Sequence, residues 1–295
     1  MTAYDIVERP ERDQLGEGAF WDEAGHAFWW VDIVAAEAKR LDPATGAIRR
    51  WKLPSFSSAV VPTTRGDAIV ALVDGLHRLD LDTGRTTPLA RPDPDPGNRS
   101  NECRADPRGN LWLGTMQNNL GPGGAPVPLV RSSGGFFRVT PDGASRRMVN
   151  GVGISNILCW SPDGRRLYCA DTMRGVIWSY AYDADEGRIS DRKVFVEGGP
   201  GGPDGSSMDL DGCLWTARWG GSRVIRYTPE GGIDRELMLP VEQPSNVAFG
   251  GADRKTLYIT SARQELERLA PDSLDGAVFV IPVDVAGMPM ARFAG

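Results

Sequence analysis

Histidine is scarce in this chain, which has only His26 and His77 among its 295 residues. His26 lies in the turn Glu23-Ala24-Gly25-His26, and His77 lies in a strand-like run. No motif surrounds either residue, so an exposed turn and a sheet surface are their expected places. Chemistry that depends on histidine, such as a Ser-His-Asp triad or a His-rich metal site, is therefore a poor candidate.

The chain also lacks the paired cysteine spacing of a zinc or redox motif. Its four cysteines form no C-x-x-C pair, and each lies in or beside an apolar strand-like run. They are Cys103, Cys159, Cys169 and Cys213. This usage favours buried free thiols in a reducing compartment over a disulfide framework or a structural zinc site.

Long apolar runs and basic blocks are absent as well. No stretch approaches the roughly 20 apolar residues of a membrane span, and the start MTAYDIVERPERD has charges where a signal peptide has its apolar core. The net charge of −6 is spread along the chain, with no cluster of Lys and Arg that would attract a nucleic acid. We therefore expect a cytoplasmic protein that binds neither membranes nor nucleic acids.

Helical periodicity is nearly absent, and in its place the sequence repeats. An apolar run followed by a turn that ends in glycine occurs six times, at 40–46, 78–84, 137–143, 180–187, 226–231 and 281–287. A second apolar run precedes each of them, so every unit reads as four short strands. Repeats of about 40–50 residues with four strands are typical of propeller blades, whereas β-helix repeats are shorter and a sandwich shows no sixfold repeat. The sequence therefore predicts an all-β fold, a six-bladed β-propeller, as a single domain over residues 1–295.

Two intervals between the repeats are long and contain insertions. Residues 117–134 are rich in Gly and Pro and could cap the mouth of the central channel, and residues 263–276 could form a helical turn. A strand near residues 4–8 is expected to pair with the last blade at 277–282 and to close the ring, which protects the sheet edges.

One position in each unit carries an oxygen-bearing polar side chain. It opens the first strand of the unit and precedes the next turn by eight residues. Because the first strand of each blade lines the channel of a propeller, these side chains should form a ring inside it. The ring consists of Glu17, Ser58, Asn101, Asn156, Asp204 and Asn246. Asn, Asp and Ser are also common at strand starts, so a set of capping side chains remains an alternative.

The ring contains two carboxylates, Glu17 and Asp204, and no basic residue at an equivalent position. Buried carboxylates need a counter-charge, and a divalent cation would supply it. Ligation by oxygen alone suits Ca²⁺, Mg²⁺ or Mn²⁺ better than a soft metal. The sequence thus indicates one divalent metal ion in the channel.

Several motifs, in this order, resemble the SMP-30/gluconolactonase family, which includes regucalcin and sugar-acid lactonases. They are LGEG (15–18), WVDI (30–33), R-x-N (99–101), LWLGTM (111–116), ISN (154–156), WSPDG (160–164), YCADT (168–172), GGPDG (201–205), LWTARWGGSRVIRYTPEG (214–231), FGG (249–251) and YITSAR (258–263). They span nearly the whole chain, and the pattern looks most like bacterial aldonolactonases. The resemblance implies a six-bladed propeller with one metal in its channel, which hydrolyses a sugar 1,4- or 1,5-lactone to the aldonic acid.

The resemblance also implies roles for individual residues. The family's metal ligands match Glu17, Asn156 and Asp204 here, with Ca²⁺ as the expected ion and Mn²⁺, Mg²⁺, Fe²⁺ or Zn²⁺ as alternatives. The R-x-N motif makes Arg99 a substrate contact and puts Asn101 close to the metal or its water. The three ligand positions and Asn101 all belong to the ring that was found without reference to the family.

Two places depart from the family's pattern. Glu102-Cys103 follows R-x-N, where Asp-Gly or Asp-Ala is usual. Gln117 and Asn118 stand where the loop after Met116 often carries an acidic residue that binds substrate hydroxyls, and they are the expected substrate contacts there. Both changes bear on which lactone is bound rather than on the metal.

Hydrolysis needs a base for the attacking water. With no histidine at hand, Asp204 is the best candidate, since its carboxylate would lie beside the metal, and a metal-bound hydroxide remains the variant. Two other functions stay open: a calcium-binding regulatory protein, in which Arg99 and Asn101 would be idle, and an organophosphate or aryl-ester hydrolase on the same scaffold. The default for a closed propeller is a monomer, here with a small sugar lactone as its partner.

Overall fold

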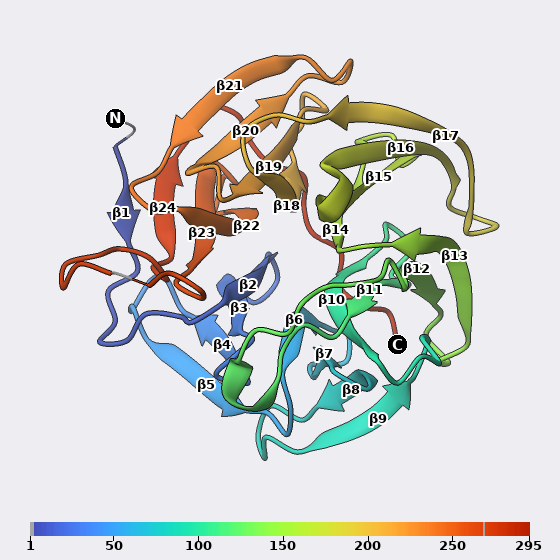
Figure 1. Ribbon diagram of the computed structural model, residues 1–295, viewed down its shortest axis with the longest axis horizontal. Coiled ribbons are helices and arrows are strands. Elements are labelled where there is room, and N and C mark those ends of the chain that lie inside the picture. The colour runs from blue at the N-terminus through green and yellow to red at the C-terminus, as the bar shows by residue number, and fades with distance from the viewer. Residues whose placement is uncertain (1–2, 268) are drawn as a thin grey trace.

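The chain folds into six sheets arranged around a central channel, as Figure 1 shows. The computed structural model describes residues 3–267 and 269–295, and in these it has twenty-four strands in six four-stranded antiparallel sheets. The predicted six-bladed β-propeller is therefore confirmed. Met1 and Thr2 of the predicted N-terminal start and Arg268 of the second insertion lie outside the described residues.

The first three blades follow one another along the chain, each running from the channel outward. Blade 1 consists of β2 (Gly16–Asp22), β3 (Ala27–Asp32), β4 (Glu37–Leu41) and β5 (Ile48–Lys52). Blade 2 consists of β6 (Ser57–Pro62), β7 (Ala68–Leu72), β8 (Gly75–Leu79) and β9 (Thr86–Ala90). Blade 3 consists of β10 (Asn98–Ala105), β11 (Leu111–Gln117), β12 (Gly134–Val139) and β13 (Ser145–Val152), with the 3₁₀ turn η1 (Pro122–Gly124) in its insertion.

The last three blades repeat this order. Blade 4 consists of β14 (Ser155–Trp160), β15 (Arg166–Asp171), β16 (Val176–Asp183) and β17 (Arg188–Glu197), with the 3₁₀ turn η2 (Thr172–Arg174) after β15. Blade 5 consists of β18 (Gly202–Met208), β19 (Leu214–Trp219), β20 (Arg223–Tyr227) and β21 (Ile233–Met238). Blade 6 consists of β22 (Gln243–Gly250), β23 (Thr256–Ala262), β24 (Phe279–Pro282) and β1 (Asp5–Ile6).

The N-terminal strand closes the ring as the sequence predicts. β1 pairs with β24 through Asp5 opposite Val280 and Ile6 opposite Phe279. Blade 6 thus combines the first and the last strand of the chain, β1 and β24, which lie side by side near the N-terminus in Figure 1. This pairing covers the edge that β24 would otherwise expose.

The two inner strands of each blade are the most deeply buried. β3, β7 and β11 are buried along their whole length, because neighbouring sheets pack against both of their faces. Trp112 and Trp215 are fully buried in these strands, and their indole N–H groups donate to Asp106 and Asp209 at 3.4 and 2.8 Å. A buried indole usually finds such a partner.

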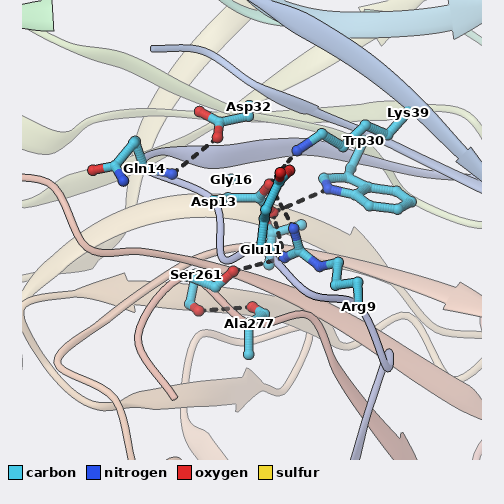
Figure 2. Close-up of polar contacts among 12 residues, drawn as sticks. Arg9, Glu11, Asp13, Gln14, Gly16, Trp30, Asp32, Lys39, Ser261 and Ala277 are labelled. Atoms are coloured by element: carbon cyan, nitrogen blue, oxygen red, sulfur yellow. Dashed lines mark hydrogen bonds and ion pairs between the residues drawn. The ribbon is translucent and has the colours of Figure 1, made fainter. Parts of the chain in front are cut away.

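A buried ionic cluster holds the start of β2 in place (Figure 2). The Asp13 carboxylate, which is fully buried, accepts from both terminal nitrogens of Arg9 at 2.8 and 2.7 Å and from Lys39 Nζ at 2.5 Å. The indole of Trp30 donates to the same carboxylate at 3.1 Å. A Cβ at Gly16 would lie 2.8 Å from the Ser261 carbonyl oxygen, so the chain approaches blade 6 closely at the first residue of β2.

Three smaller predictions can be compared with the fold. All four cysteines lie in the described chain, and all are free and buried, as predicted. Residues 263–267 and 269–276 contain turns but no helical turn, so that expectation is wrong. Among the described residues, no helix has the length and apolar character needed to cross a membrane.

Candidate functional site

Every inner strand has an irregularity in its pairing at the ring position. The register shifts lie between Glu17 and Phe20, Ser57 and Val60, Ser100 and Cys103, Asn156 and Leu158, Pro203 and Ser206, and Pro244 and Asn246. A bulge bends a strand and re-aims a side chain. Two of these sites contain left-handed backbone, at Gly18 (φ 63°) and Ile157 (φ 57°). The six polar positions therefore share a backbone feature as well as a sequence spacing.

Four of the six ring residues line one cavity of about 500 Å³. These are Glu17, Asn101, Asn156 and Asp204, and Arg99 lies in the same wall. The remaining two, Ser58 and Asn246, are not among its described lining residues. The ring thus divides into members that face the cavity and members that support its walls.

Asn101 and Asn156 are joined directly. Asn101 Nδ2 donates to Asn156 Oδ1 at 3.2 Å and to the Ser155 carbonyl at 2.8 Å. Asn156 Nδ2 donates to Thr172 Oγ1 at 2.8 Å, and that hydroxyl donates to the Pro203 carbonyl at 2.6 Å. Because the amide nitrogen of Asn156 is engaged with Thr172, its oxygen is the end that faces Asn101.

Glu17 is held by its own strand and by blade 6. Its Oε2 accepts from the Gly18 amide at 3.1 Å and from Asn246 Nδ2 at 3.0 Å. Asn246 Oδ1 in turn accepts from Arg104 Nη2 at 3.0 Å. Asn246 is therefore a positioning residue for Glu17, which its place in the sequence ring did not reveal.

The two ring carboxylates of the cavity, Glu17 and Asp204, are in an environment that disfavours charge. Burial raises the pKa of Glu17 to about 7, although the hydrogen bond from Asn246 lowers this pKa in part. Burial, followed by repulsion from Glu17 and Glu102, raises the pKa of Asp204 well above its usual range. Burial also lowers the pKa of Arg99 to about 10, although Glu17 and Asp204 oppose this shift. The two carboxylates thus repel each other in a site with little counter-charge.

The donor set fits a hard divalent cation. Arg99 is the one basic side chain among the described residues that line the cavity. Two carboxylates and one amide oxygen are ligands that Ca²⁺ accepts, and a cation between Glu17 and Asp204 would offset their repulsion. No group of three or more His, Cys, Asp or Glu suited to a metal occurs in the described part of the chain. This fits a site whose third donor is the amide of Asn156.

Arg99 is anchored from two sides, which leaves little of its guanidinium free. Nε and Nη2 donate to Asn119 Oδ1 at 3.0 and 2.9 Å, and Nη1 donates to Asn101 Oδ1 and the Ser100 carbonyl, both at 2.8 Å. Asn119 itself lines the cavity. The guanidinium plane is therefore fixed beside the two carboxylates.

A family model described as SMP-30/Gluconolactonase/LRE-like region matches residues 15–263. The chain belongs to this family. One relative, named 6-deoxy-6-sulfogluconolactonase from Pseudomonas putida, is 36% identical over 98% of both chains. A second, named L-arabinolactonase from Azospirillum brasilense, is 36% identical over 96% of this chain and 93% of the relative.

A solved structure described as a calcium-binding protein, regucalcin, from Agrobacterium tumefaciens has the same architecture. Its TM-score is 0.90 at 31% identity, and the match covers 100% of this chain and 98% of that one. The resemblance to the SMP-30/gluconolactonase family read from the motifs is thereby confirmed.

Two residues expected from the family resemblance to contact substrate do not line the cavity. Gln117 Nε2 donates to the Pro128 carbonyl at 2.9 Å, and its Oε1 accepts from the amides of Val130 and Arg131 at 2.9 and 3.1 Å. Asn118 Oδ1 accepts from the Leu120 amide at 3.1 Å. Both side chains hold the insertion together, and the cavity instead meets Asn119.

The two insertions form the outer part of the cavity wall. Pro126, Val127, Pro128 and Leu129 of the first insertion line it, opposite Gln264 and Glu265 of the second. In Figure 1 the first insertion is the green segment in front of β6. The expectation that this segment lies over the channel mouth agrees with these positions. Gln264 and Glu265 were not found from the sequence, because nothing in their spacing marks them. Asn119 belongs to the run Gln117-Asn118-Asn119, of which only the first two residues were the expected contacts.

Proposed function

We propose that this chain is a metal-dependent lactonase that opens a sugar 1,4- or 1,5-lactone to its aldonic acid, in the oxidative breakdown of pentoses or hexoses. The observation that carries the proposal is the convergence of Glu17, Asn156, Asp204, Asn101 and Arg99 on one cavity. The relatives named 6-deoxy-6-sulfogluconolactonase and L-arabinolactonase support the same reaction class. The cavity of about 500 Å³ is within the usual size range of small-molecule sites.

Glu17, Asn156 and Asp204 would hold the metal, and Ca²⁺ is the ion that oxygen-only ligation favours. Bound there, the ion would act as a Lewis acid on the lactone carbonyl and offset the charge that develops on its oxygen. Asn246 and Thr172 would support this set by orienting Glu17 and Asn156, through hydrogen bonds of 3.0 and 2.8 Å.

The remaining chemistry falls to side chains of the chain itself. Arg99, with its guanidinium held by Asn119 and Asn101, would orient the lactone through the N–H that these partners leave free. Asp204 would accept the proton of the attacking water as the water oxygen bonds to the carbonyl carbon. The bond between that carbon and the ring oxygen then breaks, and the ring oxygen takes the proton from Asp204 and leaves as a hydroxyl group.

The test is a pH-stat assay on protein stripped with EDTA and then reloaded with Ca²⁺, Mn²⁺ or Mg²⁺. L-Arabinono-1,4-lactone, D-xylono-1,4-lactone and D-glucono-1,5-lactone are the substrates, with paraoxon and phenyl acetate beside them. We expect turnover of at least one lactone that depends on metal and is lost in Asp204→Asn but kept in Asp253→Asn, a change at an exposed position. Retention of full turnover in metal-loaded Asp204→Asn would refute the role of Asp204 as the base.

A calcium-binding regulatory role is the second candidate, because the regucalcin structure from Agrobacterium tumefaciens is described as calcium-binding. The same preparation separates the two. Calcium binding by calorimetry with no turnover of any lactone or ester would favour the regulatory role. Turnover of paraoxon in preference to all three lactones would favour the organophosphate hydrolase instead.

A further inference from the structure

A second cavity lies at the other end of the channel. Its volume is about 420 Å³, and it shares no described lining residue with the first. The segment after β24 crosses this end: the amides of Met288, Phe293 and Ala294 donate to the carbonyls of Met208, Pro62 and Gly109 at 2.8, 3.1 and 2.9 Å. Figure 1 shows this C-terminal segment passing behind the inner strands. The two cavities are therefore separate sites on opposite ends of the propeller.

The walls of the second cavity are mainly apolar. Its large side chains are Phe20, Leu158, Trp160, Met208, Met288 and Met290. Three of these are methionines, whose flexible thioethers adapt to the shape of an apolar guest. The Cys159 thiol, which also lines the wall, already has a partner in Ser206 Oγ at 3.0 Å. The cavity thus offers shape and apolar surface but few free polar partners.

One buried cation, Arg104, faces this cavity with donors to spare. Its side chain is nearly enclosed, with the residue 6% exposed. Nη2 donates to the Ala19 carbonyl at 3.4 Å and to Asn246 Oδ1 at 3.0 Å, whereas Nη1 meets only the Met290 sulfur at 3.7 Å. The Glu102 carboxylate lies 3.8 Å from Nε, too far for a hydrogen bond. Within the described chain, Nε and Nη1 therefore have no oxygen acceptor.

From this combination we propose that the second cavity binds a compact apolar molecule that carries one carboxylate. One carboxylate oxygen would accept a charge-assisted hydrogen bond from Nη1 of Arg104, whose present contact is the Met290 sulfur. The apolar part would lie against the methionines and Trp160. Without a ligand, Nη1 has a sulfur as its only acceptor within the described chain, and a carboxylate oxygen there would supply the stronger hydrogen bond that is the physical basis of the affinity.

The same walls exclude the aldonic acid that the proposed reaction releases. An aldonate has a hydroxyl on nearly every carbon, and each would lose its hydrogen bonds to water against Phe20, Leu158 and the methionines. The rim also favours one orientation of the ligand. Pro162 and Asp163 are exposed there, and the Asp163 carboxylate repels an anion from the rim. The carboxylate of the ligand is thus directed inward, to Arg104.

The experiment is isothermal titration of the metal-loaded protein with 4-phenylbutyrate, its neutral amide 4-phenylbutyramide, and D-gluconate. We expect one site for 4-phenylbutyrate, at least about tenfold weaker binding of the amide, and an unchanged 4-phenylbutyrate affinity in the presence of gluconate, since the charge-assisted hydrogen bond is lost in the first case and the hydroxyls would be unsatisfied in this cavity in the second. Equal binding of acid and amide, or no binding of the acid at millimolar concentration, would overturn the proposal.

Variants locate the site without touching Arg104. Met288→Trp fills the cavity from its half-buried C-terminal wall, and Leu210→Trp adds the same side chain at an exposed position outside the cavity. We expect the first to weaken 4-phenylbutyrate binding at least about tenfold and the second to leave it unchanged. Ala291→Leu is the smaller filling change if Met288→Trp fails to fold. Undiminished binding in both folded filling variants would assign the ligand to another place and refute the site.

Discussion

The stability of the metal-free protein should fall as the pH rises through neutrality, because of Glu17. Burial raises the pKa of this carboxyl group from an ordinary 4.5 to about 7 in the folded chain. Between these values the folded state holds a proton that the unfolded state has released. The stability that this proton contributes is therefore complete below pH 4.5 and is lost as the pH passes through about 7.

The size of the effect follows from the shift. A difference of this size is worth about 3 kcal/mol between the two ends of the window, at roughly 1.4 kcal/mol per unit of pKa. About 2 kcal/mol of this is lost between pH 5.5 and pH 8.5, because pH 5.5 already lies one unit above the pKa of the unfolded state. A chain of 295 residues unfolds with an entropy of roughly 0.6 kcal/mol/K, so the midpoint of thermal unfolding should fall by about 3 °C over this range. Asp204, whose pKa is also raised, adds to the loss in the same direction.

A bound cation should reverse this dependence. Metal competes with protons for Glu17 and Asp204, so its affinity and the stability that it adds both increase with pH. Differential scanning fluorimetry in EDTA and in saturating Ca²⁺, at pH 5.5 and 8.5, measures both effects. The stabilisation by Ca²⁺ should be larger at pH 8.5.

Glu17→Gln is the decisive variant, since it keeps an acceptor for Asn246 and removes the titration. In EDTA at pH 8.5 it should be more stable than the parent by about 3 kcal/mol, and its slope with pH should be smaller. Glu230→Gln changes an exposed carboxylate and should keep the parent slope. If parent and Glu17→Gln show the same pH dependence in EDTA, the electrostatic reasoning about the cavity is wrong.

Three further predictions concern single side chains. Asn156→Ala should weaken Ca²⁺ binding in isothermal titration by about 10–100-fold with the metal-free melting midpoint nearly unchanged, and unaltered affinity would exclude Asn156 as a ligand. Asp13→Ala leaves Arg9 as a buried charge without a carboxylate partner and Lys39 with only the Glu37 carboxylate at 3.7 Å, and should lower the free energy of unfolding in urea by about 3–5 kcal/mol, whereas a cost below about 1 kcal/mol would contradict the cluster. Gln117→Ala removes three hydrogen bonds from the first insertion and should raise KM for the best lactone with little change in kcat, while an unchanged KM would separate the insertion from substrate binding.

The ring of polar residues could be predicted from the sequence because the first hairpin of each blade has nearly the same length. A constant distance from the hairpin turn then marks the same level in the channel in all six blades. The bulges at Glu17, Asn156 and their counterparts preserve that level, since each falls at the ring position. The bulges themselves could not be predicted from the sequence, because a bulge changes the backbone pairing and not the residue types.

The place of Gln117 outside the cavity lining has a different cause. Side chains alternate in direction along a strand, and Met116 lines the cavity while Gln117, the last residue of β11, holds the insertion. Three consecutive polar residues follow Met116 in the sequence, and the path of the loop decides which of them turns inward. Asn119 is the residue that turns inward, where its Oδ1 accepts a hydrogen bond from Arg99. This contact joins residues twenty positions apart in the chain.

The unusual Glu102 gains meaning from its neighbours. Its Oε1 accepts from the Cys103 amide at 2.9 Å, its Oε2 has no partner within the described chain, and its charge acts on both Glu17 and Asp204. Three carboxylates thus share the centre of the channel with Arg99 and Arg104, so the fold bears an electrostatic cost there when no cation is bound. The hydrogen bonds of the six sheets and of the β1–β24 pair do not involve the site, so they stabilise the fold against this electrostatic cost. A metal at Glu17 and Asp204 would remove much of that cost. The repulsion among the carboxylates, which lowers the stability of the metal-free chain, is then also the source of its affinity for the ion.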